Sequence, residues 1–161
     1  MNRVTILGVG NYLMGDEGVG VHFANMLEKE DLPDGIRVVE GGAGGFKLME
    51  FLDDGAHVVL VDATLDHHPA GTIRHIVPKF AADFPKAMST HEIGLKDLVE
   101  SLMLLGRLPP IHLFVVTIPS IQPVSIELSD EVRACLPELR RQVIAMSMEL
   151  LGSAETWALP N

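Results

Sequence analysis

RVTILGVGNYLMGDEGVG, at residues 3–20, predicts a strand that runs directly into a helix. The aliphatic and β-branched segment from Arg3 to Val9 is typical of a strand, and Gly10 and Asn11 end it. Beyond this turn the apolar side chains recur at helical spacing, at Val19, Phe23, Met26 and Leu27. The stretch is therefore a β-then-α unit, the building block of α/β folds.

The same order of strand and helix repeats along the chain. Further strands are predicted at residues 36–40, 57–63, 71–77 and 112–118. The run at 57–63 is apolar on both faces, which is typical of a central strand in a parallel sheet. The strand at 71–77 follows too short a loop for a helical crossover, so we expect it to pair antiparallel at a sheet edge.

Three further helices are indicated by apolar residues at helical spacing, and the second begins at a capping box from Ser89 to Glu92. The apolar faces are Phe46, Met49 and Leu52; Leu95, Leu98, Leu102 and Leu105; and Val132, Leu136, Leu139, Val143, Met146 and Leu150. These elements predict an α/β fold with three αβα layers, in which a mostly parallel, twisted sheet of about five strands carries helices on both faces.

The length and composition favour one compact globular unit. A chain of 161 residues has room for a single domain, taken as 1–161, and its tail at 152–161 lacks periodicity and is expected to be mobile. A content of 47% hydrophobic residues excludes intrinsic disorder. The formal charge of −10 disfavours phosphate backbones, so nucleic acid is excluded as a partner.

Cysteine usage and hydropathy indicate the compartment. Cys135 is the only cysteine, so no internal disulfide can form and a reducing compartment is favoured. Apolar runs such as 58–61 and 113–116 are far shorter than the roughly 20 residues of a membrane span, and no signal-peptide pattern opens the chain. We therefore expect a cytoplasmic protein that binds no membrane, and we expect a monomer.

Polar residues follow predicted strands in three places, where ligands bind in open α/β sheets. Asp16 and Glu17 lie in the loop after the first strand, Asp62 ends the strand at 57–63, and His91 falls in the first turn of a later helix. The positive end of that helix favours the neutral imidazole, which is the metal-binding form. Two carboxylates and one imidazole at one rim predict a site for a divalent transition metal with open positions, without naming the metal.

These residues also have structural interpretations, which the sequence leaves open. Asp16 or Glu17 at a helix start could be a cap or a partner of the helix dipole, whereas a buried carboxylate such as Asp62 needs pairing or a function. His68 lies six residues beyond Asp62 and is kept as a reserve ligand. Cys135 is expected to pack in the core. The rings of His22, His57 and His67 are expected to be solvated. The same is expected of His68 if it binds no metal.

Several common enzyme motifs are missing from the sequence. Leu13 stands where the dinucleotide fingerprint that begins at Gly8 requires glycine, and no Gly-Lys-Ser or Gly-Lys-Thr occurs. Neither Gly-x-Ser-x-Gly nor His-Glu-x-x-His is present. No organic cofactor is therefore expected, and standard serine hydrolases and zincins are disfavoured.

The opening residues closely resemble the signature of hydrogenase maturation proteases: Ile6-Leu7-Gly8-Val9-Gly10-Asn11 with Asp16-Glu17-Gly18-Val19-Gly20. Gly41-Gly42, Val61-Asp62-Ala63 and Ser89-Thr90-His91 follow in the same order and at similar spacing as in that family. The resemblance spans roughly residues 3 to 150.

This resemblance implies a cytoplasmic endopeptidase that trims the C-terminal extension of a nickel-loaded [NiFe] hydrogenase large-subunit precursor. By motif position, Glu17, Asp62 and His91 are the implied nickel contacts and catalytic residues, and the family is often grouped with aspartic-type endopeptidases. The nickel is then supplied by the substrate. Where the family commonly has Asp before the paired glycines, this chain has Glu40, which together with Asp16 is an accessory candidate.

The attacking water could be bound to the nickel or activated by Glu17 or Asp16, and the sequence does not separate these routes. Two rival functions use the same candidate metal site. One is a metallohydrolase that holds its own zinc at Glu17, Asp62 and His91. The other is a noncatalytic nickel or hydrogenase chaperone.

Overall fold

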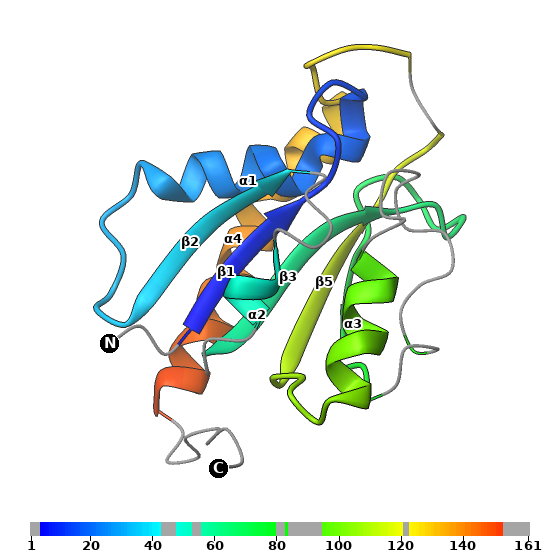
Figure 1. The fold of residues 1–161 in the computed structure, drawn as a ribbon. Helices are drawn as coiled ribbons and strands as arrows, with labels where there is room; N and C mark the ends of the chain where they lie inside the picture. Colours follow the sequence, from blue (N-terminus) through cyan, green and yellow to red (C-terminus); the bar gives the residue numbers. More distant parts are fainter. Residues whose placement is uncertain are drawn as a thin grey trace.

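The computed structural model describes residues 4–42, 48–52, 56–79, 83, 95–120 and 123–152, apart from the side chains of 95–98. Within these ranges five strands alternate with one 3-10 helix and four α-helices (Figure 1). The strands are β1 (Val4–Val9), β2 (Ile36–Gly42), β3 (His57–Thr64), β4 (Ile73–Ile76) and β5 (Ile111–Thr117). The helices are η1 (Gly15–Gly18), α1 (Val19–Glu28), α2 (Met49–Leu52), α3 (Leu95–Leu104) and α4 (Asp130–Gly152).

The strands form one sheet with the order β2-β1-β3-β5-β4. β1 pairs in parallel with β2 and β3, and β3 pairs in parallel with β5. β4 is antiparallel to β5 and lies at the edge, as its short connection predicted. Because the parallel strands share one direction, the carboxyl ends of β1, β2, β3 and β5 all meet at one edge, which positions the candidate site.

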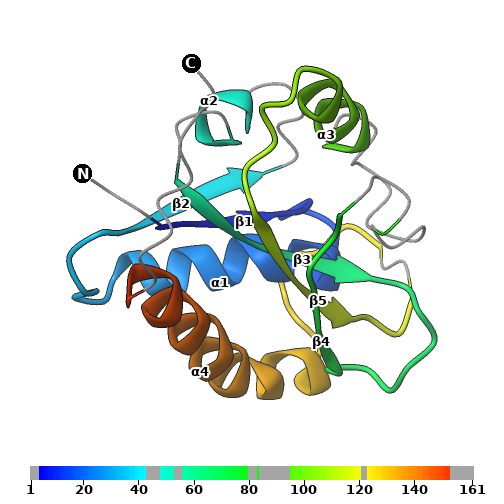
Figure 2. The ribbon, with the colours of Figure 1, turned by 90° about the horizontal axis from the view of Figure 1, so that it is seen from below.

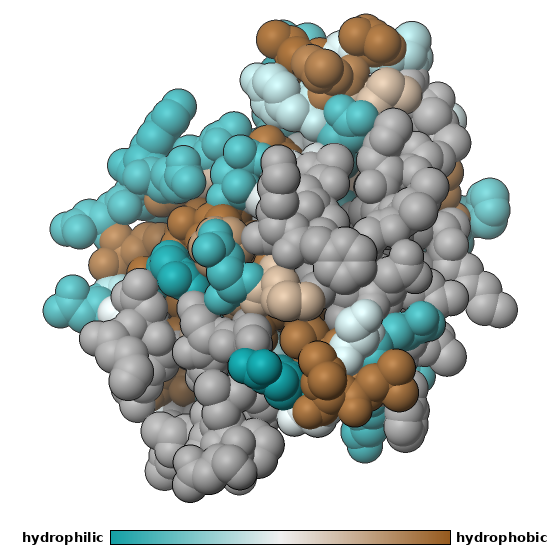
Figure 3. Space-filling model, in the orientation of Figure 1, coloured by the Kyte–Doolittle hydropathy of each residue, from teal (hydrophilic) through white to brown (hydrophobic). Residues whose placement is uncertain are grey.

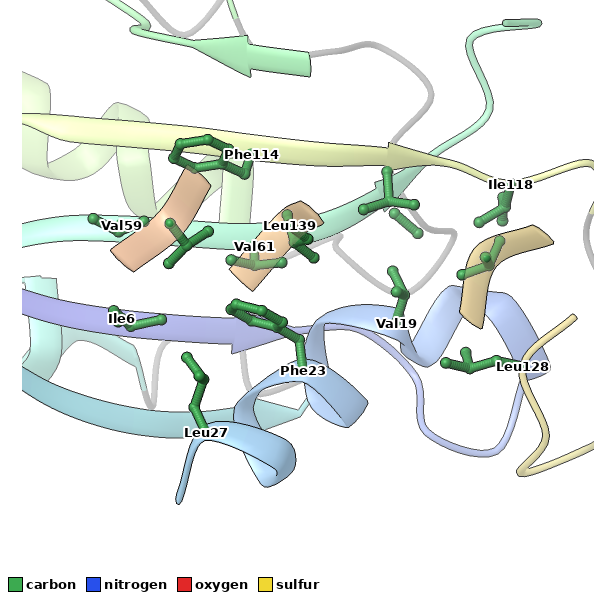
Figure 4. Close-up of a cluster of buried hydrophobic side chains, with 14 of the residues drawn as sticks. Ile6, Val19, Phe23, Leu27, Val59, Val61, Phe114, Ile118, Leu128 and Leu139 are labelled. Atoms are coloured by element: carbon green, nitrogen blue, oxygen red, sulfur yellow. The ribbon is translucent and has the colours of Figure 1, made fainter. Parts of the chain in front are cut away.

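Helices cover both faces of the sheet, so the three-layer prediction is confirmed. Figure 2 shows α1 and α4 on one face and α2 with α3 on the other. Phe23 of α1 and Leu139 of α4 pack against Val61 (Figure 4). We call the buried apolar side chains on this face of the sheet the first core cluster and those on the opposite face the second cluster. Leu60, the neighbour of Val61 in β3, joins the second cluster with Leu102 of α3. This alternation follows from the two-residue period of a strand.

The end of α3 departs from the prediction. Leu105 was expected on the apolar face of this helix, but it lies in a turn and is 63% exposed. Gly106 has a φ of +66°, and the N–H of Arg107 donates to the carbonyl of Leu102 at 2.8 Å. This left-handed glycine cap stops the helix before the apolar spacing ends.

Some predicted features fall outside the described residues. Among them are Arg3, Phe46 and the capping box from Ser89 to Glu92. Gly152 is the last residue of α4, and the rest of the predicted tail is not described. Across the described part of the chain, no helix is both long and apolar enough to cross a membrane.

Candidate active site at the carboxyl edge of the sheet

Glycines let the start of α1 lie directly against the ends of β1 and β3. A Cβ atom on Gly8 would overlap the carbonyl oxygen of Gly20. A Cβ atom on Gly20 would in turn overlap the carbonyl oxygens of Val9 and Val61. The spaced glycines of the opening stretch are therefore required by close backbone contact, and they bring the first turn of α1 to the carboxyl edge of the sheet.

Gly10 brings two of the predicted site residues together. It has a φ of +140°, a conformation that side chains rarely adopt. A Cβ atom at this position would overlap the carbonyl oxygen of Glu17 and would lie 3.6 Å from Oδ1 of Asp62. η1, which carries Glu17, also packs against β3, which carries Asp62. The backbone carbonyl of Glu17 and the side chain of Asp62 therefore both lie next to Gly10.

Both of these carboxylates are fully buried. Glu17 and Asp62 have 0% exposed surface, although each would be strongly solvated in the unfolded chain. Oδ1 of Asp62 accepts a hydrogen bond from the backbone N–H of Ala63 at 2.7 Å. Asp62 pairs with Val115 across the β3–β5 ladder, so its backbone is held in the middle of the sheet. A rigid strand and a short 3-10 turn thus place two acids at the carboxyl edge.

Asp16 makes a different contact. It is also fully buried, and its Oδ1 accepts a hydrogen bond from the backbone N–H of Ser129 at 2.7 Å. Ser129 directly precedes α4, so Asp16 ties η1 to the start of that helix. This contact supports the structural interpretation of Asp16, as a residue that holds two elements together.

Glu40 does not join these two buried acids in the structure. Glu40 lies opposite Gly8 on the edge strand β2, and its side chain is exposed. His91 lies outside the described residues, so its role as third ligand stays a prediction. Among the residues that are described, no three His, Cys, Asp or Glu side chains gather so that they could hold a metal ion.

The remaining candidates divide between the core and the surface. His67 and His68 are exposed, as predicted. The prediction of solvated rings is wrong for His22 and His57, which are half-buried. Burial lowers the pKa of His22, although a hydrogen bond to the backbone of Ile126 opposes this effect. Periodicity did not reveal this, because residues distant in sequence bury the ring.

Cys135 packs against the first core cluster, which confirms its predicted role. Burial, with a smaller contribution from Asp16, raises the pKa of the Cys135 thiol to about 11. The thiol is therefore protonated at neutral pH and is a poor nucleophile.

The sequence analysis missed a polar network around Asp66, in the loop that follows β3. Oδ1 of Asp66 accepts a hydrogen bond from Thr117 Oγ1 at 2.6 Å, and Oδ2 lies 2.9 Å from Arg74 Nε. Desolvation alone would raise the pKa of Asp66, but the hydrogen bonds from Thr117 and the His68 backbone, with the charge of Arg74, lower it. The network joins this loop to β4 and β5. Its partners are too far apart in sequence to form a motif.

Comparisons with known proteins agree on one family. A family model described as hydrogenase maturation protease matches residues 21–146. Hydrogenase 2 maturation protease from Escherichia coli K12 is 31% identical over 150 residues, which cover 91% of this chain and 92% of the relative.

Solved structures give the same answer. The hydrogenase maturating endopeptidase HybD from E. coli aligns with a TM-score of 0.81 at 31% identity, over 91% of this chain and 93% of that chain. The [NiFe] hydrogenase maturation protease HybD from Thermococcus kodakarensis aligns with a TM-score of 0.70 at 29% identity, over 92% of this chain and 98% of that chain.

Proposed function

Because this chain belongs to the hydrogenase maturation protease family, we propose that it removes the C-terminal extension of a nickel-loaded [NiFe] hydrogenase large-subunit precursor. The reaction is hydrolysis of one peptide bond, and the products are the mature large subunit and a short peptide. The enzyme works in the cytoplasm and uses no organic cofactor.

The observation that carries the proposal is that Glu17 and Asp62 are both fully buried next to Gly10, where the backbone of Glu17 and the side chain of Asp62 come together. Two acids placed by rigid elements at the carboxyl edge are suited to bind a metal ion that arrives with the substrate. His91 is the third contact in this proposal. Since both acids are fully buried in the free enzyme, binding of the precursor must be accompanied by a displacement that exposes them.

Recognition and catalysis then use the same contact. The nickel belongs to the precursor, and the side chains of the protease complete its coordination, which holds the scissile bond in place. A water molecule attacks the peptide carbonyl, and a carboxylate accepts its proton. We assign that proton transfer to Glu17, which the family resemblance places among the catalytic residues, whereas Asp16 joins η1 to the start of α4. In this mechanism the enzyme is aspartic-type only in the sense that a carboxylate activates the water. Glu40, whose side chain is exposed, has at most an accessory role.

The test is a processing assay with purified large-subunit precursor, read by mass spectrometry. The unmodified enzyme is expected to shorten the nickel-loaded precursor and to leave the nickel-free precursor intact. Glu17→Gln, Asp62→Asn and His91→Ala are each expected to lower the processing rate by 100-fold or more, on the order of the general-acid–base contribution. Glu28→Gln and Asp31→Asn are matched controls on exposed acids and should keep the full rate.

Three outcomes would contradict the proposal in different ways. Rapid cleavage of the nickel-free precursor would exclude recognition through substrate nickel. Stoichiometric zinc in the purified enzyme, lost in Asp62→Asn, would favour a metallohydrolase with its own metal. Stable binding of the loaded precursor without any shortening would favour a noncatalytic chaperone.

A further inference from the structure

Four apolar side chains are exposed together at the carboxyl edge of the sheet. Leu13 is 56% exposed and Val124 is 79% exposed, while Tyr12 and Ile126 are 39% and 50% exposed. They lie on two loops, one between β1 and η1 and the other between β5 and α4. We call these four residues the apolar rim. Figure 3 shows apolar side chains gathered at the upper end of the molecule, over these two loops.

Backbone hydrogen bonds hold the two loops of the apolar rim side by side. The N–H of Ser125 donates to the carbonyl of Leu13 at 2.8 Å, and the N–H of Gly15 donates to the carbonyl of Ser125 at 2.7 Å. Met14 and Ser125 form a parallel bridge between them. The ring of Tyr12 also lies against His22 of α1, with 4.9 Å between ring centroids. The apolar rim is therefore preorganised, which lowers the entropic cost of binding a partner.

The apolar rim continues directly into the candidate active site. Tyr12 and Leu13 belong to the loop that leads into η1, which carries Glu17, and the N–H of Glu17 donates to the carbonyl of Met14 at 3.2 Å. On the other loop, Leu128 is buried in the first core cluster, close to Val19 in Figure 4. Both loops are thus held to the core and expose apolar side chains to solvent, and the first of them leads into the helix that carries Glu17.

We propose that the apolar rim is the docking surface for an apolar segment of the large-subunit precursor next to its cleavage site. This inference rests on the proposed function. Exposed apolar side chains that gather beside a site usually mark an interaction surface. Contact with the apolar rim would bring the scissile segment to Glu17 and Asp62, and Tyr12 supplies the kind of aromatic anchor that dominates binding energy at interfaces.

A second copy of the chain fits the apolar rim less well. A formal charge of −10 on each copy opposes self-association. Stable interfaces use about 20 to 30 residues on each side, far more than these four side chains. A small apolar contact suits a substrate that binds, is cut and must then leave.

The experiment compares the double variant Leu13→Ser/Val124→Ser with the unmodified enzyme on the nickel-loaded precursor. The KM for the precursor is expected to rise about tenfold, because aliphatic contact area is lost. The kcat should stay within about twofold, because the buried acids are untouched. The matched control is Leu104→Ser/Leu105→Ser, two exposed leucines at the end of α3, and it should leave both constants unchanged. Circular dichroism checks that both variants are folded.

An unchanged KM in a folded Leu13→Ser/Val124→Ser enzyme would overturn the inference. So would a dimer of the unmodified protein in analytical ultracentrifugation that dissociates in this variant. Failure of the unmodified enzyme to shorten the precursor would instead overturn the proposed function, so the two ideas can fail separately.

Discussion

At the scale of single residues, glycines determine how closely the first helix approaches the sheet. Gly20 lies in the first turn of α1, where alanine would normally be the better helix former by about 1 kcal/mol. In this position a methyl group would overlap two backbone carbonyl oxygens, and backbone cannot move aside as a flexible side chain can.

We therefore expect Gly20→Ala to lower the free energy of unfolding by about 1 to 3 kcal/mol or more, despite its gain in helix propensity. Urea denaturation followed by circular dichroism measures this change. Gly152→Ala at the end of α4 is the control, since among the described residues no atom beyond its own helix turn and chain neighbours lies within 4 Å of the new methyl group. Equal stability of the two variants would show that the close contact has no energetic consequence.

The two neighbouring acids of η1 are expected to respond differently to loss of charge. Asp16→Ala should lower the free energy of unfolding by about 1 to 3 kcal/mol, because the N–H of Ser129 loses its buried acceptor. Asp16→Asn keeps an acceptor oxygen and should restore most of the stability and the processing rate. Glu17→Gln should remain folded and lose processing. A folded but inactive Asp16→Asn would show that Asp16 takes part in the chemistry.

At the scale of elements, α4 covers the face of the sheet that α1 begins to cover. Leu139 is fully buried where α4 meets the first core cluster. At the surface, Arg140 of the same helix donates two hydrogen bonds to Glu30, just after α1, from Nε at 2.9 Å and from Nη2 at 2.7 Å. Because that ion pair is exposed, it contributes little to stability. The burial of apolar side chains therefore supplies most of the free energy that holds α4 against the sheet.

Leu139→Ala is accordingly expected to cost about 2 to 5 kcal/mol of unfolding free energy through the cavity that it leaves. Leu104→Ala removes the same atoms from a side chain that is 90% exposed, and it should change stability by no more than about 0.5 kcal/mol. Thermal denaturation of both variants tests the difference. A small loss for Leu139→Ala would mean that the helix holds its position without this contact.

At the scale of the whole molecule, three histidines that pack against other side chains link stability to pH. Burial lowers the pKa of His22, His75 and His112. The neighbouring rings of His75 and His57 lower the pKa of His112 further. The charge of Glu149 opposes the shifts of His75 and His112. The rings of His75 and His112 are joined by a hydrogen bond of 2.9 Å between Nε2 and Nδ1. The folded protein therefore favours neutral rings.

Since these pKa values are lower in the folded protein than in the unfolded chain, the unfolded chain binds more protons just below pH 6.5. The stabilisation that comes from the neutral histidines is fully present above about pH 6.5. It is lost as the pH falls towards the pKa values of these histidines in the folded protein. We expect the melting temperature to decrease between pH 7 and pH 5, and less steeply in His112→Gln. Exposed His68→Gln is the control and should keep the original slope. A melting temperature that is flat or rising towards pH 5 would contradict this linkage.

The sequence by itself predicted the strands and α-helices, because the periods of strands and helices are local, but it did not predict η1 or where α3 ends. It predicted five strands, the apolar face of α4, and an antiparallel edge strand at 71–77, which the structure has at Ile73–Ile76. It also singled out Glu17 and Asp62 as the acids at the carboxyl edge.

The tertiary structure alone decided which residues meet. Gly10 lies next to the backbone of Glu17 and the side chain of Asp62, and Asp16 reaches Ser129, which is 113 residues away in the chain. The burial of His22 and the pairing of the two loops of the apolar rim likewise depend on packing between distant segments. Periodicity reports which way a side chain faces within its own element, whereas the identity of its neighbour is set only when the elements pack together.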